Sequence, residues 1–194
     1  MREIKSELID FIDQKLSHIG AAQEAIKNKD SRKVFVFAAE ALLGIREATG
    51  NNDGKMVELI QETIGGHGHE PWCMSYVQSC LAYAEVKTET QSPIIASEHC
   101  WTVWKDTPII QRVRLKPKRG AIIIWNYPPG VNGHTGIVDE YENVKGKMLT
   151  YEGNTTSGIN PDGTIEREGG GTYMAERSIR GSVKMKLLGF LKPF

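Results

Sequence analysis

The spacing of apolar side chains changes near Gly120, and this change constrains the fold more than any other feature of the sequence. Before Gly120, apolar residues recur every three or four positions, as they do on one face of a helix. After it, short apolar runs alternate with clusters of glycine, asparagine and proline, which is typical of strands joined by turns. Because helices come first and antiparallel strands later, the pattern predicts an α+β fold. We expect helices at about 3–18, 21–27, 32–49, 56–64 and 73–85, and strands at about 121–125, 134–141, 147–151 and within 180–191.

Composition argues against several classes of function. The chain has 194 residues, with 24 basic and 24 acidic side chains and a formal net charge of zero. This balance argues against a nucleic acid or an anionic membrane as the main partner. No apolar run is long enough to span a bilayer, and the amphipathic N-terminus lacks a signal-peptide core. We therefore expect a monomeric protein that is made in the cytoplasm and reaches its substrate by an unidentified route.

The three cysteines differ in their surroundings. An odd number of cysteines without a signal peptide makes a disulfide framework an unfavourable interpretation. Cys73 follows a loop rich in glycine and histidine and opens a predicted helix, where the positive end of the helix dipole favours the reactive thiolate. Cys80 lies two turns later among apolar residues, and we expect it in the hydrophobic core. We expect Cys100 either in the core or next to the site. Cys73 is thus the candidate nucleophile.

A base and an orienting residue follow on the predicted strands. His134 lies among small residues, in Gly-His-Thr-Gly, which leaves space for a thiol to approach its ring. If the hairpin turns near 143–146, paired residues have numbers that sum to about 288 to 290. That register brings Glu152 and Asn154 close to His134, where either side chain can hold the imidazole in one tautomer. Taken alone, both residues also fit ordinary polar positions at a strand end.

These motifs together resemble the CHAP family of cell-wall amidases and peptidases. The resemblance rests on Pro-Trp-Cys at 71–73, Gly-Ala-Ile-Ile-Ile-Trp at 120–125, Gly-His-Thr-Gly-Ile-Val at 133–138 and Tyr-Glu-Gly-Asn at 151–154. It implies a papain-like fold, with an antiparallel sheet, at 45–194, preceded by a helical segment at 1–44 that we expect to pack on the same chain. The end of the sequence, 188–193, is similar to the last strand of phage-borne members.

The resemblance also implies a function and a set of site residues. The expected reaction is cleavage of an amide bond in bacterial peptidoglycan, without a cofactor or metal, and hence a thiol-dependent hydrolase of the endolysin type. Cys73 is then the nucleophile and His134 the base, and Glu152 and Asn154 orient the histidine. Further expected substrate-binding residues are Trp72, His69 and Trp125.

Three other interpretations stay open at this stage. The first is another cysteine acyl-transfer enzyme on the same scaffold, such as a transamidase or a protein hydrolase of toxin type. The second is a binding module without catalytic activity. The third is a zinc site, because histidine and cysteine are preferred zinc ligands; its candidate ligands are His67, His69, Cys73, His99 and Cys100. The loop before Cys73 has few carboxylates, which disfavours calcium.

Overall fold

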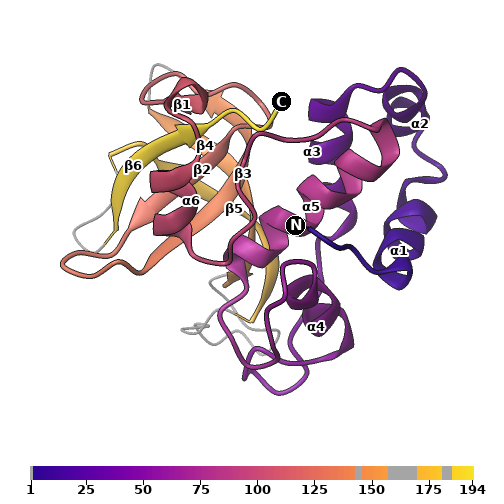
Figure 1. Ribbon diagram of the computed structural model, residues 1–194, viewed down its shortest axis with the longest axis horizontal. Helices are drawn as coiled ribbons and strands as arrows, with labels where there is room; N and C mark the ends of the chain where they lie inside the picture. The colour runs from indigo at the N-terminus through magenta and orange to yellow at the C-terminus, as the bar shows by residue number, and fades with distance from the viewer. Residues whose placement is uncertain (1, 143–145, 157–169, 181–184) are drawn as a thin grey trace.

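A computed structural model describes residues 2–142, 146–156, 170–180 and 185–194 (Figure 1). Over these residues the chain forms six α-helices and one six-stranded sheet, which confirms the α+β prediction. The helices are α1 (Ser6–Leu16), α2 (Gly20–Lys27), α3 (Ser31–Ala41), α4 (Lys55–Glu62), α5 (Cys73–Thr88) and α6 (Cys100–Asp106). The strands are β1 (Arg112–Val113), β2 (Ile122–Asn126), β3 (Gly133–Glu142), β4 (Lys147–Thr155), β5 (Gly171–Ser178) and β6 (Lys186–Leu191).

The sheet has the order β1-β6-β2-β3-β4-β5, and all neighbouring strands are antiparallel. In the β3–β4 hairpin, Ile137 pairs with Tyr151 and Val138 with Thr150. This pairing confirms the predicted register. The turn expected at 143–146 and the first part of the closing strand expected within 180–191 lie mostly outside the described residues.

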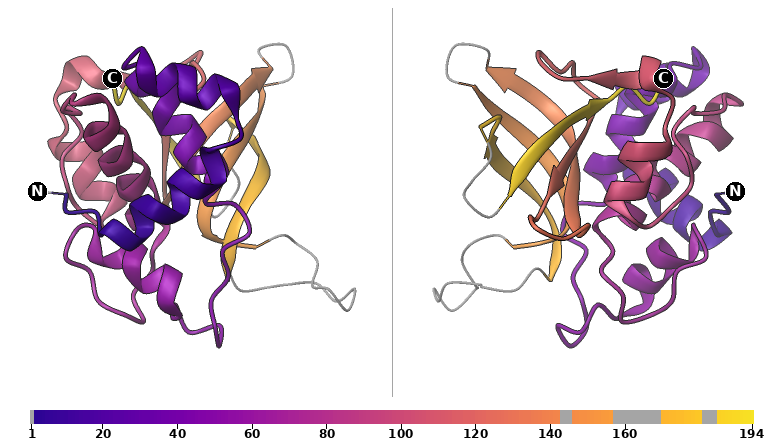
Figure 2. Two further views of the ribbon diagram at one scale, coloured as in Figure 1. Left: turned by 90° about the vertical axis from the view of Figure 1, so that its right-hand side faces the viewer. Right: turned by 60° about the vertical axis from the view of Figure 1, so that its left-hand side comes forward.

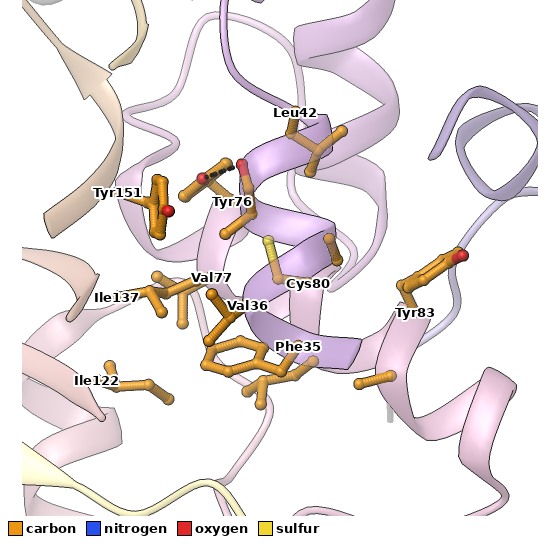
Figure 3. Packing of buried hydrophobic residues seen from close by; sticks show 14 of the residues in the cluster. Phe35, Val36, Leu42, Tyr76, Val77, Cys80, Tyr83, Ile122, Ile137 and Tyr151 are labelled. Carbon is orange, nitrogen blue, oxygen red and sulfur yellow. Dashed lines mark hydrogen bonds between the residues drawn. The ribbon is translucent and has the colours of Figure 1, made fainter. Parts of the chain in front are cut away.

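Helix α5 is the buried centre of the molecule. It lies between the sheet and the N-terminal helices, and Figure 2 shows the same layers from two other directions. Figure 3 shows Phe35 of α3 and Val77 of α5 packed beside Ile122 and Ile137 of the sheet. All four side chains are fully buried, and each burial of this kind contributes about 1.5–3 kcal/mol. The core therefore fixes the start of α5 relative to β3 and β4.

The N-terminal helices pack on the same chain, as expected. One buried cluster runs from Leu8 in α1 through α3 and α5 to residues of the sheet. Asp30 precedes helix α3 and caps it, because its side chain accepts a hydrogen bond from the Lys33 N–H at 3.1 Å. A boundary between 44 and 45 stays a prediction, because the buried cluster continues across it.

The helix predicted at 32–49 is too long, since α3 ends at Ala41. The chain then becomes extended and pairs with the edge of the sheet, where Arg46 bridges Gly171. The Thr172 hydroxyl accepts from the Ile45 N–H at 3.0 Å and donates to the Leu42 carbonyl oxygen at 2.6 Å. The helical spacing of apolar residues does not indicate that this segment pairs with strand β5, because β5 is not among the strands that the sequence predicts. No described helix is long and apolar enough to cross a membrane.

Candidate active site

The site lies where the start of α5 meets β3 and β4. Cys73 is the first residue of α5, and its side chain is nearly buried, with 8% of its surface exposed. Residues at the first turn of a helix have N–H groups without a partner inside the helix, and these groups favour an anion. The fold thus places the sulfur at the positive end of a sixteen-residue helix.

His134, near the start of β3, connects the thiol to a carboxylate. Its Nε2 lies 2.8 Å from Oε2 of Glu152, and its ring also shares a hydrogen bond with the side chain of Cys73. Since Nε2 is used by Glu152, Nδ1 is the nitrogen left for the sulfur. The ring stacks on Trp125 of β2 with 5.8 Å between centroids and 16° between planes. These contacts hold the imidazole in one orientation and one tautomer.

Glu152 is the most heavily bonded side chain of the site. It is fully buried and accepts hydrogen bonds from the hydroxyls of Thr150 at 2.6 Å and Thr155 at 3.3 Å. A Cβ on Gly136 would lie 2.7 Å from Cγ of Glu152, so the glycine on β3 leaves the space that the carboxylate occupies. The small residues around His134 therefore make room for Glu152 as well as for the thiol.

Arg177 on β5 completes the cluster, and it is not among the site residues that the sequence predicts. Its Nε donates to Oε1 of Glu152 at 2.7 Å and its Nη2 contacts Oε2, while its guanidinium lies over the Trp125 ring at 5.8 Å from the centroid. The carboxylate is thus shared between the imidazole and a guanidinium. No motif in the sequence connects strand β5 to the site, and the sequence does not predict this strand.

The electrostatic surroundings favour the charged forms of all three central groups. A hydrogen bond from the Cys100 thiol lowers the pKa of Cys73 most, burial opposes this effect, and His134 lowers it further. Burial alone lowers the pKa of His134, but the hydrogen bonds with Cys73 and Glu152 raise it to about 10. Burial alone raises the pKa of Glu152, but Arg177 and His134 bring it to about 2. These shifts all favour a thiolate, an imidazolium and a carboxylate, which is the reactive arrangement of a thiol hydrolase.

A groove of about 650 Å³ opens over the sulfur. Cys73 and Cys100 lie in its wall, and the exposed apolar side chains of Trp101, Tyr127 and Val131 line it. A groove of this size is large enough to hold a small ligand or a short segment of a larger one beside the thiol.

Comparison with known proteins bears on this arrangement. Residues 65–154 match the family model of the CHAP domain. The chain contains a CHAP domain. The matched segment includes Cys73, His134 and Glu152, and it indicates a papain-like, cysteine-dependent hydrolase related to peptidoglycan degradation. No curated protein and no solved structure matches the chain significantly.

Within the CHAP domain, Glu152 and Asn154 occupy different surroundings. The carboxylate of Glu152 accepts the hydrogen bond from the imidazole, whereas Nδ2 of Asn154 donates to Oδ1 of Asn52 at 3.0 Å. Asn154 has a positive φ of 49°, which asparagine tolerates better than most residues. The geometry therefore brings Glu152 to His134 and aims the amide of Asn154 toward the loop before α4.

The expected substrate-binding residues of the CHAP domain take other places. Trp72 and Trp125 have no exposed surface, so both pack inside the protein and do not reach a substrate in the groove. The indole N–H of Trp72 donates to Glu47 at 2.9 Å, and Trp125 supports the imidazole. His69 is exposed, with Nδ1 lying 2.9 Å from the carbonyl oxygen of Asn51, and it is not part of the groove wall.

The zinc interpretation gains no support from the described residues. Among them, no group of three or more histidine, cysteine, aspartate or glutamate side chains is arranged to hold a metal ion. His67, His69 and His99 stay exposed, whereas Cys73 and Cys100 are buried.

Proposed function

We propose that the chain hydrolyses an amide bond of bacterial peptidoglycan by a thiol mechanism. The bond is the N-acetylmuramoyl–L-alanine amide or a peptide bond of the stem or cross-bridge. The observation that carries the proposal is the continuous set of hydrogen bonds from Cys73 through His134 to Glu152 at the wall of a groove.

The proposed reaction proceeds by two acyl transfers. The Cys73 thiolate attacks the carbonyl carbon, and N–H groups at the start of α5 stabilise the oxyanion. The His134 imidazolium gives its proton to the leaving amine, and the neutral imidazole then takes a proton from the water that hydrolyses the thioester. Glu152 keeps Nε2 occupied throughout, so that the proton moves only on the side that faces the sulfur.

The charge of the groove favours a substrate segment that carries an amine. Glu70 and Glu98 belong to the wall, and none of the described residues that form the wall is a lysine or an arginine. A peptide stem with a free amino group fits such a wall better than an acidic one does. Replacement of Glu98 by glutamine should raise KM for amine-bearing stem peptides more than it lowers kcat.

The decisive experiment compares digestion of purified cell walls by the wild-type protein and by Cys73→Ala. The wild type should release soluble fragments, and Cys73→Ala should release none while it keeps the same circular dichroism spectrum. Cys80→Ala is the matched control, because Cys80 is fully buried in α5 away from the groove. Mass analysis of the new termini identifies the bond cleaved.

Two results would contradict the proposal. Fragment release by Cys73→Ala would remove the cysteine from the mechanism. Intact cell walls together with hydrolysis or transamidation of soluble proteins would favour the other acyl-transfer interpretation, and iodoacetamide labelling of Cys73 near neutral pH distinguishes either enzyme from an inactive binding module.

The contacts of Glu152 and Asn154 support Glu152 as the residue that orients His134. Glu152→Ala removes the acceptor that holds the imidazole, so it should lower kcat more than Asn154→Ala does. An equal loss in both variants would contradict the assignment of Glu152. We also propose that the protein acts as a phage lysin and that a holin, a virion or a secretion system delivers it to the cell wall.

A further inference from the structure

We propose that Cys73 and Cys100 form a reversible disulfide that switches the active site off. This inference rests on the proposed function, because it concerns regulation of the same site. The two sulfur atoms are 4.0 Å apart, although 27 positions separate the residues in the sequence. A disulfide requires about 2 Å between sulfurs, so the closure needed is small.

The backbone holds the two thiols toward each other. Cys73 is the first residue of α5, and Cys100 is the first residue of α6. A Cβ on Gly133 would lie 3.1 Å from Cβ of Cys100, so the missing side chain on β3 lets α6 approach the site. The third cysteine, Cys80, lies two turns further along α5 in the apolar core, and burial raises its pKa. One pair among the three cysteines is therefore set up to react.

The roles of the two sulfurs follow from their surroundings. Both sulfurs lie in the groove wall, but Cys73 is the more acidic thiol, so a small oxidant reacts with its thiolate first. The hydrogen bond with Cys73, burial and the charge of Cys73 together raise the pKa of Cys100. When Cys73 is oxidised to a neutral sulfenic acid, its negative charge disappears, and Cys100 can react as the resolving thiol.

The oxidant in this reaction is a peroxide. The Cys73 thiolate attacks one peroxide oxygen, the O–O bond breaks, and sulfenic acid and hydroxide form. The Cys100 sulfur then attacks the Cys73 sulfur, the S–O bond breaks, and the hydroxide leaves with the thiol proton as water. The two thiols lose two electrons in total and the peroxide gains them. A dithiol reverses the reaction by attacking the disulfide.

The disulfide inhibits the enzyme and also protects Cys73 from further oxidation. A disulfide removes the nucleophile, so hydrolysis stops while the bond persists. It also prevents further oxidation of Cys73 to sulfinic and sulfonic acids, which thiols do not reverse. The enzyme should therefore survive oxidising conditions in an inactive form and regain activity on reduction.

The test treats the reduced protein with excess hydrogen peroxide, alkylates the remaining thiols and maps the peptides without reduction. In the wild type we expect a linked Cys73–Cys100 peptide pair, loss of lytic activity in proportion to the linked fraction, and recovery with dithiothreitol. Cys80→Ala should behave in the same way. Cys100→Ser should form no linkage. Under excess peroxide its Cys73 should accumulate sulfinic and sulfonic acids, so dithiothreitol should restore a smaller fraction of its reduced activity than in the wild type.

Three results would overturn the switch: sulfinic acid at Cys73 without linkage in the wild type, linkage of Cys73 to Cys80, or no more sulfinic and sulfonic acid at Cys73 in oxidised Cys100→Ser than in the oxidised wild type. Peptide mapping is independent of the substrate. If the reduced protein does not digest cell walls, the proposed function fails, while the presence or absence of the linkage still decides the proposal about the cysteine pair.

Discussion

Replacement of Glu152 by glutamine should destabilise the fold in a strongly pH-dependent manner. Glutamine keeps the shape of the side chain but removes the charge shared by His134 and Arg177. The pKa of the buried carboxyl is about 2, against an ordinary value of 4.5. At about 1.4 kcal/mol for each tenfold change in proton affinity, the charged network around Glu152 contributes roughly 3 kcal/mol to the free energy of unfolding.

The sign of the pH dependence follows from the direction of each pKa. The lowered pKa of Glu152 contributes stability that is fully present above pH 4.5 and is lost as the pH falls toward about 2. The raised pKa of His134 contributes stability that is fully present below pH 6.5 and is lost as the pH rises toward about 10. Because the two groups share one ion pair, these contributions overlap. The full effect is expected near pH 6.

The assay is urea denaturation of the wild type and Glu152→Gln between pH 3 and 6, with reductant present. At pH 6 the variant should be less stable by about 3 kcal/mol, which corresponds to a Tm lower by roughly 6–12 °C. At pH 3 the difference should shrink to about 1 kcal/mol, since the carboxylate has lost most of its advantage.

Glu176→Gln on β5 is the matched control. Its side chain is 59% exposed and pairs with Lys147, so its removal should change stability by less than about 0.5 kcal/mol at either pH. A difference between the wild type and Glu152→Gln that stays constant from pH 3 to 6 would refute the reasoning, because the loss would then come from packing and not from charge.

Three further predictions concern the ion pair, its support and the core. The lytic rate should fall as the pH rises through about 10, where His134 loses its proton, and a pH–rate profile that stays flat to pH 11 would contradict the ion pair. Arg177→Met should raise the apparent pKa of the acidic limb of that profile by about 1 to 3, and Arg177→Lys should partly reverse this rise. An unchanged acidic limb would show that the guanidinium does not lower the pKa of the site carboxyl. Tyr76→Phe removes the hydrogen bond from α5 to the last turn of α3, drawn in Figure 3, and should lower the free energy of unfolding in urea by about 1–3 kcal/mol. The control Tyr127→Phe, on the groove wall, should lower it by less than about 0.5 kcal/mol. Equal losses would show that the buried hydrogen bond adds nothing to stability.

Local sequence rules predicted the elements that carry the site. The change of apolar spacing near Gly120 gave the order of helices and strands, and the β3–β4 register followed from counting across one short turn. These features depend on neighbouring residues and on a period of two or 3.6, so a single sequence contains them. Hairpin register in particular placed Glu152 within reach of His134.

The same rules failed where a distant partner decides the conformation. Helical spacing continued past Ala41, but the backbone at 44–47 pairs with Gly171 and Thr172 far along the chain. Trp72 and Trp125 were expected at the substrate, yet the packing of α5 and the sheet encloses both. Burial depends on which faces of the helices and the sheet pack together, and a local sequence pattern does not contain that information.

The sequence by itself determined the fold class, the candidate nucleophile and base, and the hairpin that supplies a carboxylate, because each is expressed over a few neighbouring residues. Only the tertiary structure decided that Arg177 shares Glu152 with the imidazole and that Cys100 lies 4.0 Å from the reactive sulfur. Both contacts join elements distant in the chain, and their distances are set by how the core packs, so they exist only once α5, α6 and β5 have assembled.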